Sequence, residues 1–280
     1  MTAVVAITGA GSGLGRALAL AYAARGYAVA ISGRNIDKLL ETRALLEAVN
    51  ASVFSWRCDV TDEDSVRSFV EATVHQIGRI DVFINNAGYA HAGHVVDTPL
   101  SDWQTLFDTN LFGAVRACRA VIPVMRQQQA GQLINIASFA GIANAPTMAA
   151  YNASKAALIS LSETLRMELN DDHIGVTVAC PSFFDTDLHL SLQTPNPEMR
   201  GVVERLIKRS GFTAEQIAAD IMRGVDRKQF LVLSQPQSKR LYWLKRLSTR
   251  LYVRAMLNYI RQRNAKAAQY RAAAQKESAS

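Results

Sequence analysis

A tyrosine and a lysine one helical turn apart are the residues of this sequence best suited to proton transfer. Tyr151 and Lys155 lie four positions apart in a segment whose pattern predicts a helix over residues 151–169, so one helical face presents both side chains to the same site. A free tyrosine titrates near pH ~10, and a nearby ammonium favours the phenolate. We therefore expect Lys155 to lower the pKa of Tyr151 and to make it a proton donor and acceptor.

A serine precedes this pair by thirteen residues. Ser138 directly follows a predicted strand over residues 132–137, where its hydroxyl is expected to hydrogen-bond a substrate oxygen and position it. His91 and His94 are the other candidate pair, but no third ligand stands at a useful spacing, so no metal site is predicted.

A glycine-rich segment, Thr8-Gly9-Ala10-Gly11-Ser12-Gly13-Leu14-Gly15, follows the first predicted strand and opens the first predicted helix. Glycines at such a turn let the backbone approach a pyrophosphate, and the free N–H groups and positive dipole end of the helix face its charge. A tight turn that only closes the helix on the strand is the alternative. The strand-turn-helix setting favours a dinucleotide site.

Taken in order, these segments resemble the short-chain dehydrogenase/reductase family over residues 1 to about 235. The glycines at 9, 13 and 15 fit T-G-x-x-x-G-x-G, and Asn85-Asn86-Ala87-Gly88, Asn110, Ser138 and Tyr151-x-x-x-Lys155 follow at the family's spacing. The resemblance implies hydride transfer between a nicotinamide cofactor and a carbonyl or alcohol carbon. It casts Ser138, Tyr151, Lys155 and Asn110 as catalytic, with Lys155 also holding the nicotinamide ribose and Asn110 anchoring a water in the proton relay.

The same resemblance implies a set of cofactor-binding residues: Gly9, Gly11, Ser12, Gly13, Leu14, Gly15, Arg34, Asp59, Val60, Asn86, Ala87, Gly88, Tyr151, Lys155, Pro181 and Thr186. An acid usually binds the ribose hydroxyls of NAD at the end of the second strand. Gly33 stands there instead and Arg34 follows, which can pair with a 2′-phosphate, so NADP(H) is predicted, with NAD(H) and a plain loop arginine as the alternative. Asp59 is expected to receive the adenine amino group, or else to be a solvated turn residue capping a helix that starts at Asp62.

The segment from Pro181 to Thr186 resembles the family's P-G-x-x-x-T, whose threonine holds the nicotinamide carboxamide, although Ser182 replaces the glycine and leaves the backbone geometry there open. Residues 187–212, where the family places its variable substrate lid, are rich in Leu, Val, Ile and Met. Phe139, Met148, Phe183 and Phe184 flank the predicted site. These residues favour a lipophilic ketone, aldehyde or secondary alcohol, unless the apolar lid residues are simply core.

Alternating short apolar strands and longer amphipathic helices must position these groups. Strands are expected at 3–8, 28–32, 52–57, 81–85, 132–137, 175–180 and 229–234, and helices at 15–24, 37–49, 62–76, 100–127 and 151–169. Strands that are apolar throughout belong inside a parallel sheet covered on both faces. The predicted fold is therefore α/β, a Rossmann-type doubly wound parallel sheet forming one domain over residues 1–238.

Composition limits the classes of protein to which the chain can belong. Apolar residues make up 49% of the 280 and charged residues 20%, as in packed globular proteins. The three cysteines form no C-x-x-C pair, and no signal-peptide core or membrane-span pattern is seen, so the expected location is cytoplasmic. Eleven Lys or Arg and one acid lie between Lys239 and Ser280, so the net charge of +7 belongs to a basic helical extension over residues 239–280, which is expected to fray after residue 265.

This extension is expected either to touch an anionic membrane surface or to pack on the domain or another subunit; no nucleic-acid module is recognisable. The leading functional hypothesis is an NADP(H)-dependent carbonyl reductase or alcohol dehydrogenase. An NAD-dependent hydroxy-lipid dehydrogenase and a non-catalytic dinucleotide sensor are the alternatives. The resemblance also implies a homodimer or homotetramer that pairs through the long helices around Asn110 and Tyr151.

Overall fold

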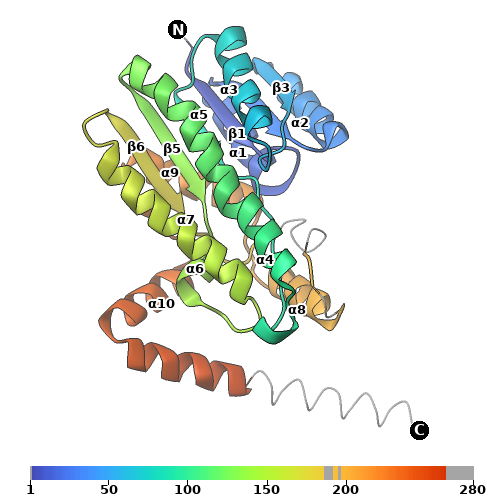
Figure 1. The fold of residues 1–280 in the computed structure, drawn as a ribbon, viewed down its shortest axis with the longest axis vertical. Coiled ribbons are helices and arrows are strands. Elements are labelled where there is room, and N and C mark those ends of the chain that lie inside the picture. Colours follow the sequence, from blue (N-terminus) through green and yellow to red (C-terminus); the bar gives the residue numbers. More distant parts are fainter. Residues whose placement is uncertain (1, 186–191, 195–196, 263–280) are drawn as a thin grey trace. The chain divides into compact units, whose positions relative to one another are not determined.

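Seven parallel strands form the centre of the computed structural model, which describes residues 2–185, 192–194 and 197–262 (Figure 1). The strands follow the order β3-β2-β1-β4-β5-β6-β7 across the sheet, and every neighbouring pair is parallel. They are β1 (Val4–Thr8), β2 (Ala28–Gly33), β3 (Val53–Arg57), β4 (Val82–Asn85), β5 (Gly131–Ile136), β6 (Ile174–Ala179) and β7 (Leu231–Val232). The predicted Rossmann-type fold is thus confirmed.

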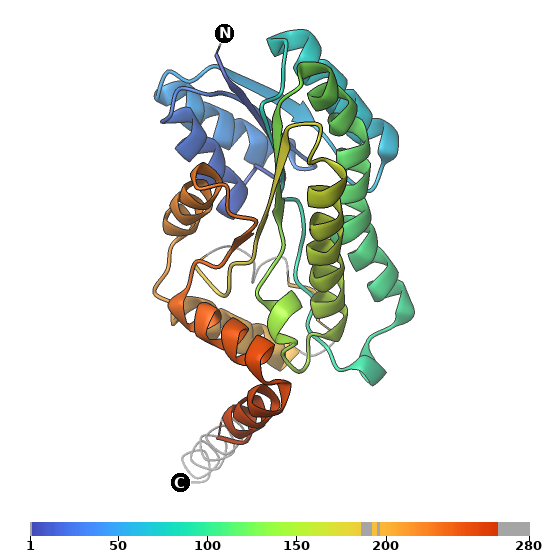
Figure 2. The same cartoon turned by 90° about the vertical axis from the view of Figure 1, so that its left-hand side faces the viewer.

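Helices cover both faces of this sheet, and Figure 2 shows the sheet between the two layers. One core cluster joins the sheet to α1 (Gly13–Ala23), α2 (Ile36–Ala48) and α9 (Ala214–Asp226), and the second joins it to α3 (Glu63–Ile77), α5 (Gly113–Gln128) and α7 (Ala149–Glu168). In β1, Val5 and Ile7 belong to the first cluster and Ala6 to the second. Both sides of a central strand are therefore buried, which explains why these strands are apolar at every position.

The helix starts follow capping chemistry. Asn35 accepts a hydrogen bond from the Lys38 N–H at the start of α2, Asp62 accepts from Asp64 and Ser65 at the start of α3, and Thr213 forms a capping box with Gln216 at α9. The remaining helices of residues 1–234 are η1 (Val95–Asp97), α4 (Leu100–Phe107), η2 (Asp108–Phe112), α6 (Ala140–Ala143) and α8 (Pro197–Lys208).

Two of the predicted elements differ in the structure, and α6, α8 and α9 are not among the predicted helices. The helix expected over residues 100–127 is interrupted by η2, a π-helical turn that separates α4 from α5. The side chain of Asn110, in the middle of this turn, bonds to the distant Tyr89 and Ser154, contacts that a local helical pattern does not encode. The last strand, expected over residues 229–234, is only Leu231–Val232.

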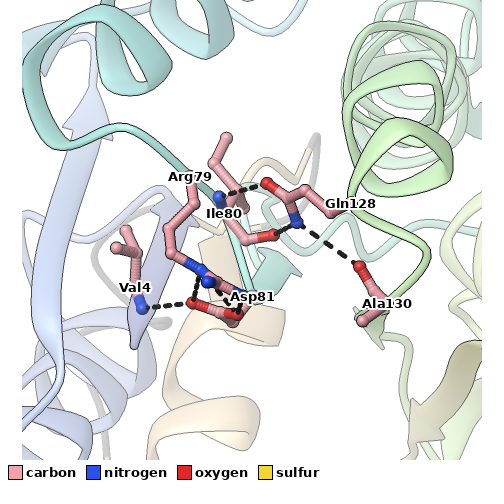
Figure 3. A network of polar contacts seen from close by, with 6 residues as sticks. All are labelled: Val4, Arg79, Ile80, Asp81, Gln128 and Ala130. Atoms are coloured by element: carbon pink, nitrogen blue, oxygen red, sulfur yellow. Dashed lines mark hydrogen bonds and ion pairs between the residues drawn. The ribbon is translucent and has the colours of Figure 1, made fainter. Parts of the chain in front are cut away.

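A closed polar network lies at the amino ends of β1, β4 and β5 (Figure 3). The Asp81 carboxylate accepts a hydrogen bond of 2.7 Å from the Val4 N–H and several from the Arg79 guanidinium. The Gln128 amide accepts from the Ile80 N–H at 3.0 Å and donates to the Ile80 carbonyl at 2.8 Å and to the Ala130 carbonyl at 3.4 Å. These groups satisfy one another's hydrogen-bonding capacity at the point where the three strands begin.

The chain divides into two units, Met1–Ser234 and Gln235–Ser280. The sequence-based boundary lay after Ser238, whereas Pro236 already opens α10 (Pro236–Leu247). A further helix spans residues 249–262, and the tail expected to fray from residue 265 lies outside the described residues. Within the described part of the chain, no helix is both long and apolar enough to cross a membrane.

Candidate active site

A cavity of about 420 Å³ opens at the carboxyl ends of β1, β2, β4, β5 and β6. In a parallel sheet this edge is where ligands bind. Of the sixteen predicted cofactor-binding residues, fourteen line the cavity, Asp59 does not, and Thr186 lies outside the described residues. Ser138 and the four predicted substrate-pocket residues line it as well. Residues that are far apart in the sequence, from Gly9 to Ile207, therefore meet at one cavity.

The glycine-rich turn forms one wall, between β1 and α1. Gly9 and Gly13 have φ values of +67° and +51°, a conformation that favours glycine. A Cβ on Gly9 would lie 2.8 Å from the Cα of Ala87, and one on Gly15 would overlap the Gly9 carbonyl oxygen. Ser12 makes no side-chain capping bond to α1. The first amides of α1 therefore have no side-chain cap and are left for an anion, at a turn that has no room for a Cβ at Gly9 or Gly15.

The segment after β4 is joined to this turn. The Asn86 amide donates to the carbonyls of Thr8 and Gly9 at 3.0 and 2.9 Å, and the Thr8 hydroxyl accepts the N–H groups of Asn86 and Ala87 at 3.1 and 3.2 Å. A Cβ on Gly88 would lie 2.8 Å from the Asn110 Oδ1 and 3.4 Å from the Lys155 Nζ. Because Gly88 has no Cβ, the segment after β4 can lie close to Asn110 and Lys155.

The proton-transfer residues meet between β5 and α7. Tyr151 and Lys155 occupy one face of the first turns of α7 and are 7% and 5% exposed. The Ser138 hydroxyl, just beyond β5, is hydrogen-bonded to Tyr151, and it also accepts the Ala140 N–H at 3.1 Å. The Lys155 Nζ donates to the Ile136 carbonyl at 2.9 Å and lies 5.9 Å from the centroid of the Tyr151 ring. Lys155 is thus bonded to the last residue of β5, and Ser138 follows two residues later in the chain.

Burial shifts the pKa values of both titratable groups against their charged forms. Burial raises the pKa of Tyr151 above its ordinary value, and the hydrogen bond with Ser138 opposes that rise. Burial lowers the pKa of Lys155 to about 8, while the neighbouring Cys180 acts to raise it. The expectation that Lys155 lowers the pKa of Tyr151 stays a prediction.

Asn110 lies behind the cavity rather than in its wall. It is 2% exposed; its Oδ1 accepts the Tyr89 N–H at 3.0 Å, and its Nδ2 donates to the Tyr89 carbonyl at 3.0 Å and to the Ser154 hydroxyl at 3.3 Å. These bonds fix the backbone after Gly88 to α7. Its expected part in a water relay stays a prediction.

The end of β2 forms the far part of the cavity. Arg34 is exposed there, and Val60 contributes an apolar contact. The Asp59 carboxylate instead accepts the N–H and hydroxyl of Thr61 at 3.0 and 2.8 Å. Burial alone would raise the pKa of Asp59, but these hydrogen bonds and the charges of Arg34 and Arg57 leave it below its ordinary value. Asp62, and not Asp59, caps α3.

The segment after β6 closes the site on the substrate side. The Pro181 carbonyl accepts the Phe139 N–H at 2.9 Å and the Ser138 hydroxyl at 3.4 Å. Ser182 is not among the residues with a positive φ, so the backbone there does not require the glycine of the family pattern. Thr186 lies outside the described residues, as does most of the expected lid up to residue 196.

Apolar side chains surround the space in front of Tyr151. Phe139, Met148, Phe183 and Phe184 line the cavity together with Val203 and Ile207 of α8. Phe183, Met148, Val203 and Ile207 also belong to one cluster with Tyr151. None of the described residues that line this cavity is acidic.

Two lining or adjacent residues were missed by sequence reasoning. Lys38, on the first turn of α2, lines the cavity beside Arg34, and its position four residues after Arg34 was the available signal. Cys180, fully buried at the end of β6, contacts Ser138 and Lys155, and burial raises the pKa of its thiol to about 12. Nothing in its sequence context marks it.

Comparison with known proteins supports the geometry. Residues 3–196 match the model of the short chain dehydrogenase family. The chain is 35% identical over 242 residues to dehydrogenase/reductase SDR family member 7B of Xenopus tropicalis, covering 82% of this chain and 77% of that protein. It is 35% identical over 227 residues to 2-(R)-hydroxypropyl-CoM dehydrogenase of Xanthobacter autotrophicus, covering 79% and 90%.

A third relative, probable oxidoreductase EphD of Mycobacterium tuberculosis, is 30% identical over 253 residues, and the chain spans only 43% of its length. Among solved structures, a short chain dehydrogenase/reductase from Burkholderia phymatum in complex with NAD superposes with a TM-score of 0.85 at 28% identity, covering 89% of this chain and 95% of that one. A Sphingobium yanoikuyae short-chain dehydrogenase in complex with NADPH gives a TM-score of 0.71 at 27% identity, covering 82% and 87%.

The family model covers β1 to β6, the glycine-rich turn and the Ser138–Tyr151–Lys155 group. The chain therefore belongs to the short-chain dehydrogenase family of NAD(P)-binding oxidoreductases.

Proposed function

We propose that this enzyme is an NADP(H)-dependent carbonyl reductase or alcohol dehydrogenase for a lipophilic ketone, aldehyde or secondary alcohol. One observation carries the proposal: a single cavity holds Ser138, Tyr151 and Lys155 against apolar walls, while Arg34 and Lys38 line it with no carboxylate among the described lining residues. The three residues and the apolar walls support the reaction and the substrate class. The two cations support the preference for NADP(H).

The residues present fit a dinucleotide. The turn at Gly9 and Gly15 has no room for a Cβ, and the amides at the start of α1 face the cavity without a side-chain cap. Such a turn suits a pyrophosphate, because backbone N–H groups can reach its oxygens directly. Lys155, which lines the same cavity, would hold the nicotinamide ribose, as the family resemblance implies.

When bound, the nicotinamide supplies or accepts the hydride. In the reducing direction, Tyr151 gives its phenolic proton to the substrate oxygen, and Ser138 donates a hydrogen bond to the same oxygen and so orients the carbonyl. The Lys155 ammonium stabilises the resulting phenolate. In the oxidising direction, the same phenolate takes the proton of the alcohol.

The coenzyme preference rests on charge. Gly33 offers no carboxylate to ribose hydroxyls, and a 2′-phosphate carries negative charge that Arg34 and Lys38 would neutralise. An NAD-dependent hydroxy-lipid dehydrogenase remains the second candidate, since related structures contain either NAD or NADPH.

Apolar walls support the substrate class. Six side chains of the pocket carry no polar atom that could recognise a charged or sugar-like substrate: Phe139, Met148, Phe183, Phe184, Val203 and Ile207. A lipophilic substituent would be stabilised there by burial, in proportion to the apolar area that it covers.

Thermal unfolding with saturating NADPH and, separately, NADH tests the coenzyme proposal, because a ligand that binds only the folded state raises the melting temperature. We expect the larger shift with NADPH, and Arg34→Ala should reduce that shift while leaving the NADH shift unchanged. A larger shift with NADH would redirect the search to oxidation of hydroxylated lipids. Turnover of medium-chain and cyclic ketones against polar, sugar-like carbonyl compounds then tests the substrate class.

We also propose that α5 and α7 pair with their counterparts in a second copy, as a homodimer or homotetramer. Phe112, beside α5, and Met167, on α7, are 49% and 72% exposed, which supports burial in an interface. Light scattering behind a sizing column measures the mass. The three buried free thiols, Cys58, Cys118 and Cys180, fit a reducing compartment such as the cytoplasm.

A further inference from the structure

Exposed apolar side chains are concentrated in the second unit. Of the sixteen large hydrophobic residues that are exposed in the described part of the chain, six lie between residues 235 and 262: Trp243, Leu247, Leu251, Val253, Leu257 and Tyr259. Leu247 is 82% exposed and Trp243 59%. Six exposed large apolar residues within 28 positions are more than scattered surface residues need, and they favour a surface that meets something other than water.

Cations share the faces that carry these residues. In α10, Arg240, Trp243 and Leu247 stand at positions i, i+3 and i+7, so they occupy one side of the helix. In the helix over residues 249–262, Arg250, Arg254 and Leu257 repeat the pattern at i, i+4 and i+7. We call these six exposed residues the basic–aromatic surface.

The described part of this unit carries positive charge without acids. The sequence from Gln235 to Gln262 contains seven Lys or Arg and no acid. Among the described residues, no ion pair is formed by six of these cations, Lys239, Arg240, Arg246, Arg250, Arg254 and Arg261. Lys245 and Arg246 instead lie over the rings of Tyr252 and Tyr242, at 5.5 and 5.8 Å from the centroids. Arg240, Arg250 and Arg254 are left facing solvent.

We propose that the basic–aromatic surface binds the anionic surface of a lipid bilayer, with the helices lying in the interface. Arginines would contact lipid phosphates and carboxylates, while Trp243, Leu247 and Leu257 would enter the boundary between headgroups and acyl chains. Tryptophan is enriched at that depth because it has an apolar body and one N–H donor.

The chemistry of the surface favours a membrane over two other occupants. A single-stranded nucleic acid would use the arginines and the indole, but it gives no favourable contact to exposed leucines. A second copy of this unit would bring seven cations against seven, which is unfavourable in the absence of acids. A bilayer with anionic lipids matches both the charge and the aliphatic side chains.

Flotation of the full chain with vesicles tests the proposal. Vesicles of phosphatidylcholine with about a third phosphatidylserine should carry the protein upward at low salt, and pure phosphatidylcholine vesicles should not. Because salt screens such attraction, binding should weaken as ionic strength rises. Failure of the wild-type chain to float with anionic vesicles at low salt would overturn the proposal.

Charge-reversal variants measure the electrostatic contribution to vesicle binding separately from the contribution of apolar insertion. Each cation near an anionic surface is worth about fivefold in affinity, so Arg250→Glu with Arg254→Glu should weaken binding by at least ~25-fold. Arg250→Lys with Arg254→Lys should keep it. The matched control, Arg209→Glu with Arg227→Glu, reverses two exposed charges in residues 1–234 and should leave binding unchanged. An unchanged melting temperature shows that each variant is folded.

Tryptophan fluorescence measures the insertion of this surface into the bilayer. Trp56→Phe with Trp103→Phe leaves Trp243 as the single tryptophan, and its emission should shift to the blue when anionic vesicles are added. Trp243→Ala with Leu247→Ala should weaken vesicle binding. If this variant binds vesicles as well as the wild type does, and polyuridine competes equally with both, the surface is a general polyanion site and the membrane proposal is wrong.

Discussion

The two ends of the central sheet use polar groups in opposite ways. At the amino ends, Asp81 and Gln128 pair with Val4, Arg79 and Ile80, so each charge and amide finds a partner within the protein (Figure 3). At the carboxyl ends, Tyr151 and Lys155 are almost completely buried, and burial shifts both pKa values against the charged form.

The difference teaches where stability is gained and where it is lost. Polar groups that are satisfied internally stabilise the fold, whereas desolvated titratable groups facing a cavity reduce the free energy of unfolding. Substitutions at the two ends should therefore have effects of opposite sign, which the following experiments test.

The largest effect is expected from Tyr151→Phe. Loss of the proton donor should lower kcat by about 10²–10⁴-fold, while the melting-temperature shift produced by the coenzyme stays nearly intact. Steady-state kinetics and thermal unfolding measure the two quantities. Equal loss of turnover and coenzyme binding would mean that the substitution damaged the fold, and unchanged turnover would refute the mechanism.

Lys155→Met should abolish turnover and yet stabilise the cofactor-free protein. Because the pKa of Lys155 falls from 10.5 to about 8 on folding, the unfolded chain binds more protons between these pH values, and wild-type stability rises with pH across that window. The variant lacks this rise. Its advantage at pH 7, on the order of 1–3 kcal/mol after loss of the bond to Ile136, should shrink steadily and vanish near pH 10. Denaturant unfolding at several pH values measures it.

Asp81→Ala, at the amino end of the sheet, should destabilise the protein and leave its turnover unchanged. It leaves the Val4 N–H and the Arg79 guanidinium without their acceptor, which costs about 1–3 kcal/mol, or a melting temperature lower by several degrees. Its kcat/KM should match that of the wild type. Asp171→Ala, which removes an exposed carboxylate, is the control and should change neither quantity.

The smallest effect is expected from Lys38→Ala. Removing one cation near the 2′-phosphate should raise KM for NADPH about fivefold to tenfold and leave KM for NADH unchanged. Arg43→Ala, on the same helix but paired with Glu47, is the matched control. An equal rise for both coenzymes would place Lys38 at the pyrophosphate, and an unchanged KM for both would exclude it from the coenzyme site.

The sequence was sufficient where local pattern and function coincide. Apolar strands, the glycine-rich turn and the four-residue spacing of Tyr151 and Lys155 are short-range signals, so the parallel sheet and most of the cavity wall could be predicted. Asn110 shows the limit, because the π-helical turn around it depends on bonds to residues 21 and 44 positions away.

Electrostatic detail was equally out of reach. The pKa direction of Tyr151 depends on how completely α7 and β5 exclude water, and spacing alone does not contain that information. The Asp59 carboxylate is held by Thr61, two residues away, yet whether it turns toward Thr61 or toward a ligand is decided by the surrounding packing.

The place of β1 between β2 and β4 has a consequence during synthesis. Val5 pairs with Val29 on one side and with Val82 on the other, so the ribosome must add more than fifty residues after β2 before the second edge of β1 can be covered. Until then, the nascent chain exposes Val4-Val5-Ala6-Ile7, an apolar strand edge of the kind that other chains can join. Chaperones that bind short apolar segments should therefore engage this protein early, and arrival of Asp81 and β4 should end that engagement.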